Sequence, residues 1–82
     1  MPANDPRSLG HNNHVELNGR KLMVQTEVLG KAELKVRTTV LESGVVRYSE
    51  SNPCPASGLE EVRPIVEAQH ARNLERVQRG EV

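Results

Sequence analysis

The sequence predicts an α+β fold of two layers, in which a four-stranded antiparallel β-meander is covered on one face by a single C-terminal helix. Three observations lead to this fold class. Apolar and polar residues alternate in four segments between residues 14 and 48, and turn sequences containing glycine separate these segments. The last third of the chain repeats its apolar residues at helical spacing. A helix of ~21 residues is roughly 31 Å long and a strand of nine residues about 30 Å, so the layers match in length.

Residues 1–13 are expected to form a flexible arm, and residues 14–82 a single small domain. The arm is rich in Pro, Asn, Gly and Ser and has no periodicity. His11 and His14 have a spacing that can hold a metal ion on a helix, but no helical pattern surrounds them. We interpret their spacing as a coincidence and expect no metal site and no other cofactor.

The first two strands are predicted to form a hairpin about Asn18-Gly19, a dipeptide that suits a two-residue turn with positive φ at both positions. Folding at this turn sets Val15 opposite Leu22 and pairs Glu16 with Lys21. The second strand then turns one set of side chains toward the helix, namely Leu22, Val24, Thr26 and Val28.

The third strand is predicted to follow a break at Leu29-Gly30-Lys31 and to turn Leu34, Val36, Thr38 and Val40 toward the helix. A short connection would set Glu27 against Glu33. A connection of five residues pairs Val28 with Leu34 and Glu27 with Lys35, which opposite charges favour. We therefore predict the longer connection.

The length of the turn at Glu42-Ser43-Gly44 determines which side chains of the fourth strand point toward the core. A two-residue turn at Ser43-Gly44 would split the apolar residues between the two faces. A three-residue loop with a bulge at Gly44 sets Val46 opposite Val40 and Tyr48 opposite Thr38, and so keeps one apolar face. The three-residue loop is therefore predicted.

The connection from sheet to helix is predicted at Pro53-Cys54-Pro55-Ala56, because its prolines suit neither a strand nor a helix. This places Cys54 on an exposed crossover, three residues before the helix. A nearby helix N-terminus can activate a thiol mildly, but no second cysteine accompanies Cys54. We interpret it as an ordinary surface or half-buried cysteine.

The helix is predicted over residues 57–80. Ser57 suits the N-cap, with Glu60 reaching back to it, and Gly80 suits a left-handed stop. Pro64 lacks the N–H that would bond the carbonyl of Glu60, so a bend or a separate first turn is expected there. One stripe of the helix carries Leu59, Val62, Val66, His70, Leu74 and Val77.

The composition predicts a thin core. Only 35% of the 82 residues are hydrophobic, and Tyr48 is the one aromatic residue. A domain of ~60 residues buries about 60% of its unfolded surface, and many such domains need additional support. The single cysteine cannot form an internal disulfide. We therefore expect self-association, as a homodimer, to supply the support.

The charges argue against two classes of partner. The chain has 11 basic and 11 acidic residues and a formal net charge of zero, so no general attraction to nucleic acid or to an anionic membrane is expected. No apolar run reaches the ~18 residues needed to cross a bilayer, and the N-terminus lacks the apolar core of a signal peptide. A free cysteine without an export signal predicts a cytoplasmic, bacterial protein.

Several short motifs lie in the predicted elements: Gln25-Thr26-Glu27, Thr39-Val40, Gly44-Val45-Val46, Ser49 and Gln69-His70. Over about residues 14–80 they resemble a group of small uncharacterised bacterial proteins, found alone or attached to other modules, with a pattern of the type QTE, T-V, G-x-V, S and QH. The resemblance implies a bacterial source and a compact domain. It implies no catalytic activity, because none is known for the group.

His70 is the candidate special residue. A titratable ring in an apolar stripe must find a hydrogen-bond partner or lose its proton, and Gln25, Thr26 or Tyr48 could supply that partner from the sheet. We interpret His70 as a core histidine; the alternative is a general base or a ligand-binding residue. Since the only aspartate is Asp5 in the arm, we predict no catalytic residue and no enzyme.

The sheet face opposite the helix is the candidate interaction surface. It is either a solvated surface or a docking face with Met23, Leu41 and Val45 at its centre. The full candidate set is Met23, Gln25, Arg37, Leu41, Val45 and Arg47.

Taken together, these features predict a non-enzymatic cytoplasmic module that forms a homodimer through a sheet edge or the outer sheet face and has an unknown protein partner. The alternative is a small-ligand or metal-binding domain, possibly catalytic, centred on His70. A weaker alternative is nucleic-acid contact through the helix arginines, which acidic residues interleave: Arg63, Arg72, Arg76 and Arg79.

Overall fold

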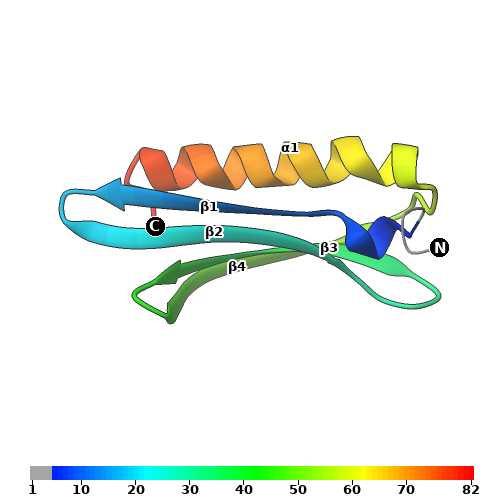
Figure 1. Cartoon of the computed structure of the whole chain (residues 1–82), viewed down its shortest axis with the longest axis horizontal. Coiled ribbons are helices and arrows are strands. Elements are labelled where there is room, and N and C mark those ends of the chain that lie inside the picture. Colours follow the sequence, from blue (N-terminus) through cyan, green and yellow to red (C-terminus); the bar gives the residue numbers. More distant parts are fainter. Residues whose placement is uncertain (1–4) are drawn as a thin grey trace.

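A computed structural model describes residues 5–82 and confirms the predicted α+β architecture (Figure 1). Four strands form an open antiparallel sheet in the order β1-β2-β3-β4, and one helix lies along one face of it. The elements are the short 3-10 turn η2 (Pro6–Ser8), β1 (Gly10–Leu17), β2 (Arg20–Leu29), β3 (Leu34–Glu42), β4 (Val45–Cys54) and α1 (Leu59–Gln78).

The first hairpin has the predicted turn. Asn18 and Gly19 take φ values of 51° and 82°, and Val15 lies opposite Leu22. The strand is longer than expected, because β1 begins at Gly10 rather than His14 and pairs as far as Glu27. Residues 10–13 therefore belong to the sheet and not to a flexible arm, while residues 1–4 of that predicted arm lie outside the described residues.

The register between β2 and β3 differs from the prediction. Val28 lies opposite Val36 rather than Leu34, and Glu27 lies opposite Arg37 rather than Lys35. Opposite-charge pairing still holds, since Arg37 forms an ion pair of 2.9 Å with Glu27. The predicted inward residues remain inward because the shift is an even number of positions.

The predicted three-residue loop between β3 and β4 is wrong. The turn has two residues, Ser43 and Gly44, with φ values of 52° and 85°. A bulge between Val40 and Leu41 then shifts the register, so that Val40 lies opposite Tyr48 and not Val46. The bulge, rather than the loop, returns Tyr48 to the apolar face.

Strand β4 continues through the segment predicted as a crossover. Pro53 lies opposite Lys35 and Cys54 opposite Leu34. A proline is compatible with this position because β4 is an edge strand, where one row of N–H groups has no neighbouring strand. Cys54 is consequently buried, with 6% of its surface exposed, and not on an exposed loop.

The helix begins one or two residues later than predicted. Gly58 is the N-cap, and the carboxylate of Glu61 accepts a hydrogen bond of 3.3 Å from its N–H; these residues replace Ser57 and Glu60. The helix runs unbroken through Pro64, whose ring is on the exposed side, so the separate first turn is absent from α1. Gly80 takes the predicted left-handed conformation, with φ of 76°.

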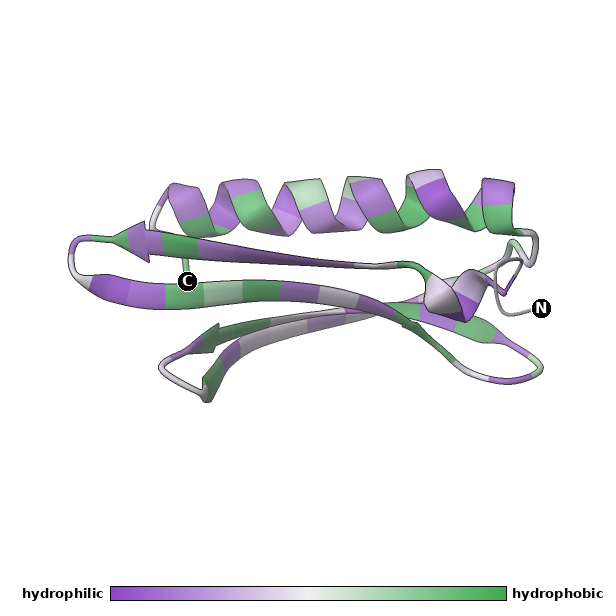
Figure 2. Ribbon diagram, viewed as in Figure 1, coloured by the Kyte–Doolittle hydropathy of each residue, from purple (hydrophilic) through white to green (hydrophobic). Residues whose placement is uncertain are grey.

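The core between the layers consists of two apolar clusters with polar residues between them. One cluster lies near the start of α1 and the other near its end, and Figure 2 shows hydrophobic colouring toward both ends of the helix side that faces the sheet. As predicted, Val24, Val36 and Val40 are buried. The cluster residues are Val28, Val36, Cys54, Val62 and Val66 in the first, and Leu22, Val24, Val40 and Val77 in the second.

Candidate functional site

Five buried polar side chains separate the two apolar clusters and form the chemically distinctive part of the molecule. Thr26 and Thr38 lie directly opposite each other on β2 and β3, with their side chains toward the helix because of the strand alternation. One turn of α1 supplies the facing residues. The set is Thr26, Thr38, Gln69, His70 and Asn73, and each is at most 6% exposed.

A chain of hydrogen bonds runs through this layer from Gln69 to Asn13. Gln69 Nε2 donates to Thr38 Oγ1 at 3.2 Å, and the two threonine hydroxyls are 2.8 Å apart. Thr26 Oγ1 lies 2.7 Å from His70 Nδ1, and His70 Nε2 lies 2.7 Å from Asn13 Oδ1. The Asn13 amide oxygen can only accept, so His70 Nε2 carries the hydrogen of a neutral ring; Nδ1 then accepts from Thr26, Thr26 accepts from Thr38, and Thr38 accepts from Gln69.

This direction requires a neutral His70. Burial lowers the pKa of His70 below its ordinary value of 6.5, and the His11 ring, with its centroid 5.2 Å away, lowers it further. A protonated Nδ1 would have to donate to Thr26, and Thr38, which would then accept from both Thr26 and Gln69, would have no acceptor for its own hydroxyl hydrogen. The neutral tautomer with hydrogen on Nε2 therefore fits the whole network.

A second branch joins the helix to strand β4. Gln69 Nε2 also lies 3.1 and 3.2 Å from the backbone oxygens of Val36 and Glu50, so its two hydrogens are shared among these oxygens and Thr38 Oγ1. The Glu50 carboxylate accepts hydrogen bonds from Asn73, Asn52 and Arg72. Burial raises the pKa of Glu50, but these bonds and the Arg72 charge outweigh it, so the net pKa lies below 4.5. Glu50 is therefore an ionised side chain held by the helix.

The structure supplies one of the three partners expected for His70. Thr26 binds it, whereas Gln25 lies on the other sheet face and Tyr48 accepts a hydrogen bond from Arg76 at 3.3 Å. The second partner, Asn13, was missed because it fell in the predicted arm. Gln69 and Asn73 were missed because the helical stripe was drawn through apolar residues, although both lie beside it at helical spacing.

The site offers little free capacity for catalysis or metal binding. Both ring nitrogens of His70 have partners, and the ring is 6% exposed. His11 and His14 point to opposite faces of β1, since His11 lies opposite the inward Thr26 and His14 opposite the outward Met23. Within residues 5–82, no three His, Cys, Asp or Glu side chains are placed to hold a metal ion.

The outer face, defined as the sheet face away from α1, carries four of the six candidate interaction residues: Met23, Gln25, Arg37 and Leu41. The other two depended on the wrong turn. Val46, not Val45, lies opposite Leu41, whereas Val45 lies opposite Glu42, and Arg47 approaches that carboxylate to 3.6 Å. The apolar row on the outer face is therefore Met23, Leu41 and Val46.

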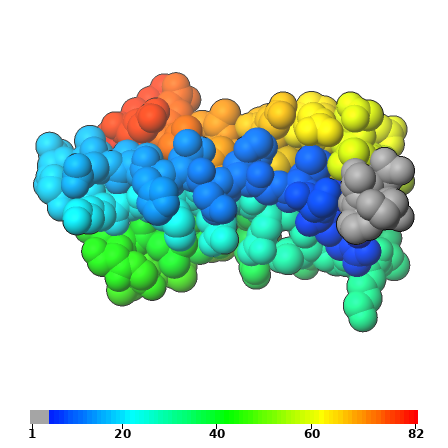
Figure 3. Space-filling model, viewed as in Figure 1, coloured from blue at the N-terminus to red at the C-terminus, as the bar shows by residue number. Residues whose placement is uncertain are grey.

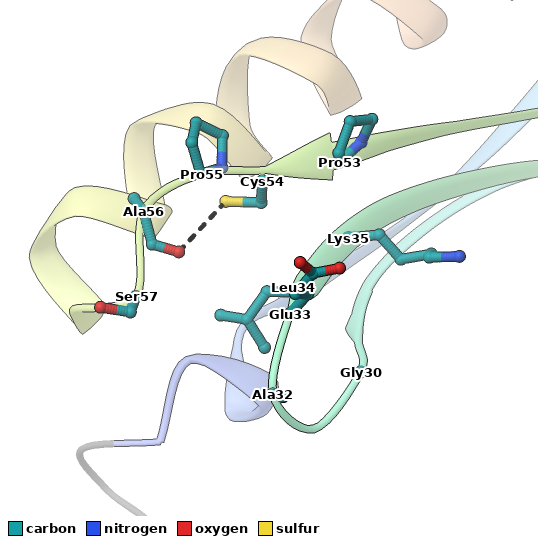
Figure 4. A pocket seen from close by; sticks show the side chains of 10 residues that line it. All are labelled: Gly30, Ala32, Glu33, Leu34, Lys35, Pro53, Cys54, Pro55, Ala56 and Ser57. Carbon is teal, nitrogen blue, oxygen red and sulfur yellow. Dashed lines mark hydrogen bonds between the residues drawn. The ribbon is translucent and has the colours of Figure 1, made fainter.

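A cleft of about 780 Å³ opens at one end of the sheet, between the β2–β3 connection and the segment that leads into α1 (Figure 4). The Cys54 thiol lines it and donates a weak hydrogen bond of 3.8 Å to the Ala56 carbonyl. Figure 4 shows Lys35, the cation of the lining, extending away from the thiol. The cleft thus holds a thiol without a neighbouring group among its lining residues that would activate it.

The helix arginines are largely engaged with this protein's own side chains. Arg72 pairs with Glu50, Arg79 with Glu75 at 3.1 Å, and Arg63 with Glu60 at 3.6 Å. The Arg76 guanidinium lies 5.1 Å from the centroid of the Tyr48 ring. These contacts neutralise much of the positive charge that nucleic-acid binding would require.

The chain was compared with models of protein families, with curated proteins and with solved structures, and none of the three comparisons found a match. No helix within residues 5–82 combines the length and the apolar character needed to cross a membrane.

Proposed function

We propose that this chain is a non-enzymatic protein–protein interaction module that self-associates as a homodimer. The observation that carries the proposal is the open sheet: among residues 5–82, nothing covers the face away from α1 and no strand pairs with the outer edges of β1 and β4 (Figure 1). On this open face Val46 is 58% exposed, and Met23 and Leu41 in the same row are half-buried. A small domain with a thin core gains stability when a second chain binds to its folded state, at the open face or at an unpaired edge strand.

The non-enzymatic part of the proposal rests on how the reactive groups are engaged. His70 bonds through both nitrogens to Thr26 and Asn13, so neither nitrogen is free to take a proton from a substrate. Cys54 is buried among cluster residues and bonded to the Ala56 carbonyl. The hydrogen bonds of His70 thus connect the helix to strands β1 and β2.

Light scattering over a wide concentration range tests self-association. We expect a dimer at about 1 mM, with dissociation on dilution as mass action requires. A monomer mass from the lowest to the highest concentration would contradict the proposal.

A matched pair of variants tests whether the outer face is the dimer contact. Val45 and Val46 are 60% and 58% exposed, so a lysine at either position should be tolerated by the fold. Only Val46 lies in the outer-face row beside Leu41. Dissociation by Val46→Lys but not by Val45→Lys would assign the contact to the outer face.

A further inference from the structure

The two edges of the sheet differ in how they are protected against strand pairing. The edge strand β4 carries three devices that discourage pairing: Pro53 lacks an N–H, a bulge interrupts its register, and the Glu50 carboxylate points toward the helix layer. An additional strand would meet few free and regularly spaced groups on this edge.

The edge strand β1 has none of these devices within Gly10–Leu17. It contains no proline and no lysine or arginine, its register with β2 is continuous over eight residue pairs, and Glu16 is its only acidic residue. Figure 3 shows the blue atoms of β1 as a continuous row across the visible surface, below α1. Such an edge is a ready template for another strand.

The two-residue turn fixes which backbone groups of β1 are free. In a hairpin of this type the residues that flank the turn, Leu17 and Arg20, exchange backbone hydrogen bonds, and the pattern then alternates along the strand. The residues that bond to β2 are His11, Asn13, Val15 and Leu17. The residues that direct N–H and C=O away from the sheet are Gly10, Asn12, His14 and Glu16.

We propose that β1 pairs antiparallel with β1 of a second copy of this chain and joins the two sheets into one. This inference rests on the proposed function and names the surface through which the module self-associates. Pairing centred on Asn13 uses all four outward residues and forms up to about eight backbone hydrogen bonds. It sets Asn12 opposite His14 and Glu16 opposite Gly10, so no like charges face each other, and the chain's zero net charge adds no general repulsion.

A proline at position 14 tests the pairing. His14→Pro removes an N–H that bonds to no residue of β2, so the fold is retained, whereas the dimer loses two hydrogen bonds by symmetry. We expect its dissociation constant, measured by sedimentation equilibrium, to rise at least about tenfold. His14→Ala keeps the N–H and is expected to leave the dimer unchanged. Asn12→Pro repeats the test at a second outward position, should His14→Pro disturb the fold.

Amide hydrogen exchange of the unaltered protein supplies an independent measurement. At high concentration the N–H groups of Asn12, His14 and Glu16 should exchange slowly, and at low concentration quickly, while that of Val15 stays protected throughout. A dimer that is unaffected by both prolines, or that Val46→Lys dissociates, would overturn the assignment to β1 while leaving self-association intact. A monomer at all concentrations would overturn both.

Discussion

Thr26 Oγ1 lies 2.7 Å from His70 Nδ1, and this contact joins the sheet to the helix between the two apolar clusters. Around it, hydroxyl, amide and imidazole groups bond to one another over three strands and one helix, and the amide oxygen of Asn73 is the one side-chain oxygen of the five buried residues without a partner. A polar network of this kind is stabilising only when it is complete, because each buried group left without a partner costs about 1–3 kcal/mol. The contribution of His70 to stability therefore depends on its hydrogen bonds to Thr26 and Asn13.

A double-mutant cycle measures the coupling of Thr26 and His70. His70→Leu should lower the free energy of unfolding by about 1–3 kcal/mol, since it leaves Thr26 and Asn13 without their shared partner. Combined with Thr26→Val, the total loss should be smaller than the sum of the single losses by about 1 kcal/mol. Urea denaturation of the four proteins provides these values. Additive losses would mean that the two side chains do not interact.

Stability should fall on mild acidification. The pKa of His70 is lowered in the folded state, so the unfolded chain binds a proton first as the pH drops. The full contribution to the free energy of unfolding is present above the unfolded pKa of 6.5 and is lost as the pH falls from there to the lowered folded pKa. We expect a greater loss between about pH 7.5 and 5.5 in the natural protein than in His70→Leu. Equal losses would contradict the assignment. The Glu50 contribution is lost only below pH 4.5, outside this window.

Replacing Pro64 should stabilise the protein. The proline lies inside α1, where it removes the hydrogen bond to the carbonyl of Glu60. Pro64→Ala is expected to raise the free energy of unfolding by about 1–3 kcal/mol, less a smaller term for the freer unfolded chain. Thermal and urea unfolding measure the change. Glu67→Ala, at an exposed position one turn later, is the control and should change stability by less than about 0.5 kcal/mol. A destabilised Pro64→Ala would show that the ring has a packing role.

Cys54 should react slowly with thiol reagents. Only 6% of its surface is exposed, and it packs against Val28, Val36 and Val62. Labelling by a soluble disulfide reagent is expected to be at least about tenfold slower in the folded protein than in urea, because reaction requires access to the thiol. Comparable rates in the two conditions would place the thiol at the surface, as the sequence alone suggested.

The strands and their faces could be predicted because alternation and turn chemistry act locally. Asn18-Gly19 determines the first hairpin, and the inward positions of Val24 and Val36 follow from a period of two. The predicted register of β2 with β3 failed by two positions, since Arg37 and Lys35 are equally good partners for Glu27 by charge alone.

The remaining errors arose from long-range pairing. The bulge at Val40 and the continuation of β4 through Pro53 depend on the neighbouring strand and on the edge position, neither of which a local pattern shows. Long-range pairing also explains why the sequence did not predict the hydrogen-bond network of the candidate site. Asn13 has no apolar periodicity, and its role appears only when β1 is laid beside β2 under the helix.

The protonation state of His70 tests the central account most directly. Nitrogen chemical shifts of the imidazole, followed by NMR from about pH 8 to 5, report both the tautomer and the pKa. The network predicts a neutral ring with hydrogen on Nε2, an unprotonated Nδ1 and a pKa below 6.5. A ring that carries hydrogen on Nδ1, or that titrates at or above 6.5, would contradict the hydrogen-bond chain from Gln69 to Asn13.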